Sequence, residues 1–194
     1  ARRQRRDIDA VSHAGAFACF GLTRRQALWH AGAIERDVTT LLARIRPTPA
    51  PVPVPAMNPL EETLADYAAT TVTTGVHLLA HLRASLQARG LRTTRELAAV
   101  ADGTWVQVAG HVIVRQRPGT AKGFCFLTLE DETGTANVVI TPAVYERVRL
   151  LLNTSPILEI TGPLQRVDGV THLRARELMR IDLEGDLPAG HDYR

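Results

Sequence analysis

The spacing of apolar residues changes once along this chain, close to Asp102-Gly103. Before this point apolar residues recur every three or four positions, which is the spacing of amphipathic helices. After it they alternate with polar residues, which is the pattern of strands with one buried face. The sequence therefore predicts an α+β protein, helical in its first half and built from strands in its second.

The first helical segment is predicted over residues 3–46. We expect Gly21 to end one helix and Thr23 to begin the next, because Gln26 follows three positions later and completes a capping box. A last short helix is predicted over 38–45.

Six prolines lie between residues 47 and 59, most of them at alternate positions. Alternating proline excludes a helix and favours extended polyproline II backbone. We expect a linker here, either a mobile spacer without a function of its own or a ligand for an aromatic groove.

A second helical unit is predicted to begin at Asn58-Pro59, with proline at the first helical position. Residues 77–89 are predicted to form a helix that ends at Gly90. One further turn is expected from Thr94 to about Val100.

The strand pattern that follows has a recognisable order. Strands are predicted over 104–116, 122–131, 135–141, 156–166 and 170–182, with a helix over 142–152. Five strands with a helix after the third is the order of the OB-fold, a Greek-key barrel that binds oligonucleotides across its second and third strands. The whole chain is then expected to divide into a helical segment (1–46), a linker (47–59), a small helical unit (60–100), an OB-fold (101–184) and a tail (185–194).

Neighbouring side chains of the second predicted strand point to opposite faces. The core face is predicted to carry Cys125, Leu127 and Leu129. The outer face is predicted to carry Phe124, Phe126 and Thr128. Aromatic rings on an outer face would form a platform for stacked bases; the alternative is that Phe126 covers the barrel end or packs on the helical unit.

Basic side chains are expected beside this platform, where they would contact phosphates or, alternatively, form a solvated surface. They come from the loop between the first two strands and from the last hairpin: Arg115, Arg117, Lys122, Arg166, His172, Arg174 and Arg176. The net charge is +3, and Lys122 is the only lysine. Arginine suits phosphate contacts and stacking, so this bias is compatible with nucleic acid.

Candidates for catalysis or metal binding are absent from the pattern. The two cysteines lie far apart and the seven histidines lack metal-ligand spacing. The three acidic residues 130–132 are consecutive and would point in different directions, and Asp131 is expected to bond the backbone of a turn. No apolar run is long enough to span a membrane. We therefore expect a cytoplasmic protein with no catalytic residues, no metal site and no cofactor in this chain.

Several runs resemble the C-terminal region of bacterial error-prone DNA polymerases, the translesion branch of the C-family DNA polymerase III alpha subunits. The runs Ala14-Gly15-Ala16-Phe17 and Gly21-Leu22-Thr23-Arg24-Arg25-Gln26-Ala27-Leu28-Trp29 resemble the end of the family's helix-hairpin-helix region. The segment with Glu62, Asp66-Tyr67, Thr70-Thr71, Gly75, His77 and Leu82-Arg83 is similar to the one that follows it. Residues 112–134 resemble its OB segment, and His191-Asp192-Tyr193-Arg194 resembles its C-terminus. The chain departs from the pattern at Leu78, where the family often has proline, and in its long proline-rich linker.

This resemblance implies a parent DNA polymerase, a nucleotidyltransferase that acts in DNA-damage-induced translesion synthesis and so in DNA repair and replication. Its Mg²⁺-binding palm would precede this segment, which lacks a starting methionine and is read as a piece of a longer protein. The implied partners are an inactive accessory protein related to the Y-family polymerases and a RecA-like accessory protein.

Two hypotheses follow for the chain itself. The first is a non-catalytic module that binds single-stranded template DNA through its OB-fold. The second is a protein-docking module that recruits the polymerase to its accessory proteins.

Overall fold

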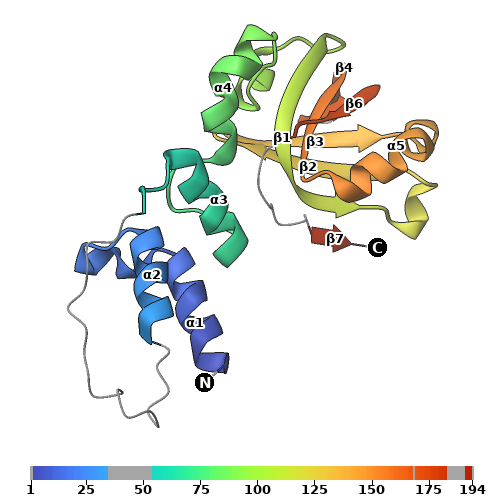
Figure 1. The fold of residues 1–194 in the computed structure, drawn as a ribbon. Coiled ribbons are helices and arrows are strands. Elements are labelled where there is room, and N and C mark those ends of the chain that lie inside the picture. Colours follow the sequence, from blue (N-terminus) through green and yellow to red (C-terminus); the bar gives the residue numbers. More distant parts are fainter. Residues whose placement is uncertain (1, 35–53, 168, 183–190, 194) are drawn as a thin grey trace, which may run out of the picture. The chain divides into compact units, whose positions relative to one another are not determined.

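The computed structural model describes residues 2–34, 54–167, 169–182 and 191–193. The chain forms two compact units, Ala1–Thr74 and Gly75–Arg194 (Figure 1). The boundary lies inside the stretch 60–100 that the sequence pattern joined into one helical unit. The predicted helix at 38–45 and most of the proline-rich linker lie outside the described residues.

The first unit is helical. Its described elements are α1 (Arg2–His13), the 3-10 helix η1 (Ala16–Phe20), α2 (Arg24–Ile34) and α3 (Pro59–Thr70). Side-chain caps begin α2 and α3 where the sequence predicted. Thr23 and Gln26 bond each other's backbone N–H groups, and Asn58 and Glu61 do the same at the start of α3.

Arg24 joins these helices through a half-buried guanidinium. It lies 2.7 Å from the Asp66 carboxylate of α3. It also donates to the carbonyl oxygens of His13, at the end of α1, and of Glu62. One side chain thus bonds to groups on both neighbouring helices.

The second unit contains the strands and two further α-helices, α4 and α5. In chain order its elements are α4 (Leu78–Ala88), η2 (Arg95–Ala99), β1 (Trp105–Gln116), η3 (Gly119–Ala121), β2 (Cys125–Asp131), β3 (Gly134–Ile140), α5 (Pro142–Thr154), β4 (Ile157–Val167), β5 (Val170–Arg174), β6 (Glu177–Arg180) and β7 (His191–Tyr193).

The strands form a barrel (Figure 1). Their order is β1-β2-β3-β5-β4, and β4 pairs again with β1 to close it. Only β3 and β5 run parallel among these five pairs. This is the predicted five-stranded OB-fold, with α5 between β3 and β4, and the α+β class is confirmed. The tail adds β7, which pairs in parallel with residues 114–116 of β1.

The core of the barrel is formed by the inward side chains of these strands. Cys125, Leu127 and Leu129 of β2 are almost wholly buried, as their alternation predicted. Helix α5 follows the end of β3, whereas η2 contacts the turn that precedes β3. The two elements therefore cover opposite ends of β3 and add their own apolar residues to the core.

The predicted last strand, 170–182, is in fact two strands. On β4, Leu164 pairs with Leu173 of β5 and Thr161 pairs with Glu177 of β6. Three steps along β4 therefore correspond to four steps along the partner segment, which contains one extra residue. The extra residue bends the chain over Gly162, as at a β-bulge. A Cβ atom at Gly162 would overlap the carbonyl oxygen of Arg174, so the bend depends on glycine at this position.

Replacing Gly162 with alanine should therefore lower the free energy of unfolding by about 3 kcal/mol, the upper end for overpacking, because backbone cannot move aside like a flexible side chain. Urea denaturation would measure the loss. Gly119→Ala is the control, since nothing lies near a Cβ there. Equal stability of the two variants would contradict the tight packing at Gly162.

Candidate nucleic-acid interface

The outer face of β2, β3 and β5 carries two rows of side chains. Register places Phe126 beside Val139, and Val139 beside Arg174. Because paired residues point to the same side of a sheet, these three residues form one row across the barrel wall. The row joins an aromatic ring, an aliphatic side chain and a guanidinium.

A second row lies two residues along each strand. It joins Thr128 on β2, Asn137 on β3 and His172 on β5. Asn137 is exposed and the other two are half-buried. Across the part of the chain that the structure describes, the Asn137 amide and the His172 imidazole have no hydrogen-bond partner. Both groups are therefore available to a ligand.

Phe126 is 36% exposed, while its neighbours Cys125 and Leu127 are buried. This is the alternation that the sequence predicted for β2. Phe124 precedes the strand and is half-buried. The rows thus bring together four of the predicted residues: Phe126, Thr128, His172 and Arg174.

Arg115 differs from this group. A register irregularity lies between Val112 and Val114, and beyond it Arg115 pairs with Leu127. The Leu127 side chain points into the core, and paired residues share a face. The Arg115 side chain therefore leaves the sheet on the face opposite to Phe126, and the residue is half-buried. The irregularity shifts the alternation of β1, which the sequence pattern does not reveal.

The loop after β1 is directed toward α5 rather than toward the rows. The guanidinium of Arg117 lies 4.1 Å from the ring centroid of Tyr145, and Nη2 is 3.5 Å from Glu146. A cation over a tyrosine ring is a stabilising contact, so Arg117 is engaged within the protein. Lys122, at the end of this loop, is exposed.

The remaining two arginines have other surroundings. Arg166 donates through Nη2 to the carbonyl oxygens of Leu97 and Ala98 in η2. Its guanidinium therefore holds η2 against β4. Arg176 lies past the end of β5 and is exposed, and it lines a hollow together with Arg147 of α5.

Asn137 and Val139 belong to the rows but were not among the predicted site residues. The signal was present in β3, where Ala136, Val138 and Ile140 are the apolar, inward series. Their neighbours must then lie outside. The prediction considered only aromatic and basic side chains, and therefore missed polar Asn137 and aliphatic Val139.

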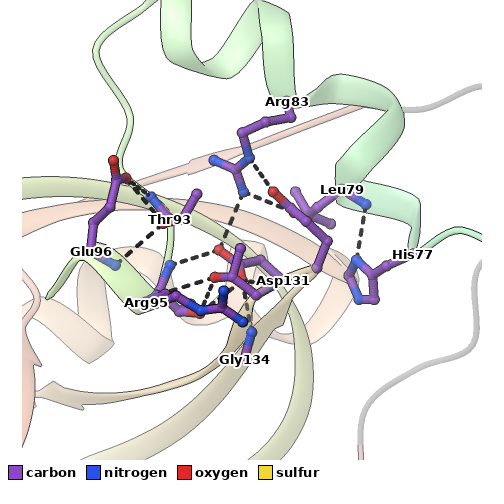
Figure 2. Close-up of polar contacts among 11 residues, drawn as sticks. His77, Leu79, Arg83, Thr93, Arg95, Glu96, Asp131 and Gly134 are labelled. Atoms are coloured by element: carbon purple, nitrogen blue, oxygen red, sulfur yellow. Dashed lines mark hydrogen bonds and ion pairs between the residues drawn. The ribbon is translucent and has the colours of Figure 1, made fainter. Parts of the chain in front are cut away.

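The turn between β2 and β3 is built around the buried carboxylate of Asp131 (Figure 2). Its oxygens accept hydrogen bonds from the N–H and hydroxyl groups of Thr94 and Thr133, and from the N–H group of Gly134. Arg83 of α4 lies 3.2 Å from it and also pairs with Glu132. The predicted role of Asp131 in the turn is confirmed, and the residue also joins α4 and η2 to the barrel.

A second ion pair holds the far end of α4. Arg89 pairs with Glu159 of β4, which is buried and also accepts a hydrogen bond from Gln107 of β1. At the start of the helix, Nδ1 of His77 accepts from the N–H group of Leu79 (Figure 2). Burial lowers the pKa of His77, although nearby carboxylates such as Glu130 oppose this shift.

No group of three or more histidine, cysteine or acidic side chains is placed to hold a metal ion within the described residues. No helix in that part of the chain is both long and apolar enough to cross a membrane.

Asp131 should make stability depend on acid pH. Burial raises the pKa of its carboxyl, but hydrogen bonds from Thr133 and Thr94 outweigh burial and hold the pKa below its usual value. The stabilisation is complete above about pH 4, the pKa of an unfolded aspartate, and is lost as the pH falls through the lowered pKa of the folded state.

Asp131→Asn should therefore lower the free energy of unfolding at pH 7 by about 2–3 kcal/mol and flatten its decline below pH 4. Denaturant titration between pH 2.5 and 7 would measure both effects. Exposed Glu146 offers the control Glu146→Gln, which should preserve the acid decline. An unchanged acid decline in Asp131→Asn would refute the assignment.

Comparison with known proteins agrees with this geometry. Residues 106–181 match the OB-fold nucleic acid binding domain of the tRNA anti-codon family. Three relatives are error-prone DNA polymerases. That of Mycolicibacterium paratuberculosis is 42% identical over 90% of this chain, that of Anaeromyxobacter dehalogenans 38% over 97%, and that of Azoarcus 43% over 92%.

These matches cover 16–17% of each relative, so the chain spans only a small part of their length. They run through both compact units, since at least nine-tenths of the chain is included. The nucleic-acid-binding family covers the barrel alone. This chain belongs to the error-prone DNA polymerases, as the counterpart of one segment that includes their OB-fold.

Proposed function

We propose that this chain is a non-catalytic, C-terminal part of an error-prone DNA polymerase and that it binds single-stranded template DNA on the outer face of β2, β3 and β5. The observation that carries the proposal is the row formed by Phe126, Val139 and Arg174. It places an exposed aromatic residue on β2, within the face of the second and third strands that binds oligonucleotides in OB-folds, and a guanidinium on β5 beside that face.

The chemistry of this face suits a strand without fixed sequence. A base stacked on an aromatic ring contributes about 1–3 kcal/mol, and every base has a face that can stack. The guanidinium of Arg174 provides the adjoining phosphate contact, with exposed Lys122 shortly before the start of β2. Because few cations are involved, binding should depend only modestly on salt.

The parent polymerase would supply the chemistry in a different segment. There, Mg²⁺ ions would assist nucleotide transfer during DNA-damage-induced translesion synthesis in the cytoplasm. The segment described here would hold the template strand that enters or leaves the catalytic part. It would increase the fraction of polymerase molecules that have template bound, and it would not take part in bond formation.

A second candidate is a docking module for two accessory proteins. One is an inactive relative of the Y-family polymerases, and the other is RecA-like. It is favoured by exposed apolar side chains on α5 and β6, away from the two rows. Leu150 is 78% exposed and Met179 is 56% exposed. Single exposed apolar residues are common, so this observation carries less weight than the rows.

Phe126→Ala should weaken binding of oligo-dT by about 5- to 150-fold, because one stacked base loses its ring. Fluorescence anisotropy at low salt would measure the affinity. Met179→Ala is the matched control, since it removes an exposed apolar side chain from β6.

The proposal fails if the unaltered chain does not bind oligo-dT at tens of micromolar, or if Phe126→Ala binds as tightly as the control. Co-purification with the two accessory proteins separates the candidates. A stable complex through Leu150 or Met179 without detectable DNA binding would establish docking instead.

A further inference from the structure

A hollow of about 190 Å³ lies beside the second row, where β3 and β5 separate. The two strands are paired only from Asn137 opposite His172 to Val139 opposite Arg174. Ahead of this pairing, Thr135 and Thr171 line the opening on either side. Residues of η2 complete the wall, including Leu97 and Ala98.

The hollow has apolar walls and a polar rim. The apolar lining comes from Leu97, Ala98, Ala136, Leu164 and Leu173. The polar lining comes from Thr94, Thr135, Asn137, Thr171 and His172. Small-ligand sites usually have mostly apolar walls with a few polar groups and volumes of roughly 300–1,000 Å³. This hollow has as many polar as apolar lining residues and is smaller. Its size suits one flat ring system.

The polar rim suits the edge of a nucleobase. An amide offers both hydrogen-bond donors and an acceptor, and a neutral imidazole offers one of each. Asn137 and His172 are register partners, so their side chains approach the same ligand from adjoining strands. Base edges carry donors and acceptors side by side, and such groups bind splayed bases in single strands.

The hollow also adjoins the stacking row. Asn137 lies two residues before Val139 on β3, which is about 7 Å along the strand. The hollow and the ring of Phe126 can therefore be reached by nearby nucleotides of one strand. The hollow lies on the side of this face that is nearer to η2, so a nucleotide next to the one stacked on Phe126 can reach it.

The wall formed by η2 is held in place before any ligand binds. Thr94 donates to Asp131 through both its N–H and its hydroxyl group, each at 2.7 Å. Arg166 donates to the carbonyl oxygens of Leu97 and Ala98. Because binding does not have to order this wall, more of the contact energy is retained as affinity.

We propose that this hollow receives one unstacked base of the bound single strand, with Asn137 and His172 bonding its edge. This rests on the proposed function, because it names a subsite on the same DNA-binding face. Arg166 then acts by positioning the η2 wall and does not contact the DNA.

The test fills the hollow. Ala98→Phe should weaken oligo-dT binding about tenfold, and Asn137→Ala somewhat less, in the 194-residue chain. An abasic sugar–phosphate oligomer of the same length has no base to enter the hollow. Both variants should therefore bind it with the same affinity as the unaltered chain. Ala99→Phe is the matched control, because Ala99 is exposed on η2 but does not line the hollow. Thermal unfolding would verify that each variant folds.

The outcomes separate this inference from the function it rests on. If Phe126→Ala weakens oligo-dT binding while Ala98→Phe and Asn137→Ala match the control, DNA binding stands and the base site is wrong. If no oligomer binds the unaltered chain, both fail. If Ala98→Phe instead disrupts only co-purification of an accessory protein, the hollow takes a protein side chain and the base site is overturned.

Discussion

The buried carboxylate of Asp131 is the interaction on which the second unit depends. It accepts from Thr94, Thr133, Gly134 and Arg83, and so connects the β2–β3 turn with η2 and α4. A buried charge without partners is costly, whereas one with several hydrogen bonds can be retained and makes the arrangement specific. This explains why α4 and η2 form one compact unit with the barrel.

Barrel closure has a corresponding effect on the candidate interface. It places β5 beside β3, although more than thirty residues separate Asn137 from His172 in sequence. The inner side chains of both strands are buried in the core, so their register is set by packing. The outer residues must then line up in rows, and the separating strand ends leave the hollow under η2.

Much of the architecture could be predicted because its causes are local. Capping residues marked the starts of α2 and α3, and alternation in β2 predicted which side chains are buried. The candidate site could be predicted only in part. Phe126 and Arg174 lie in one row on the outer face, but Arg117 stacks on Tyr145 and Arg166 bonds η2. A basic residue near the end of a strand looks the same in sequence whether it contacts solvent, a ligand or another part of the protein.

The sequence by itself determined the periodicity of each segment, the helix starts and the order of strands, since these depend on neighbours within a few residues. Tertiary structure decided three other features: the break of the last strand over Gly162, the turn of Arg115 away from Phe126, and the pairing of Asn137 with His172. Each of these depends on contact between residues far apart in sequence. Such contacts are set by packing in the closed barrel, which no local pattern records.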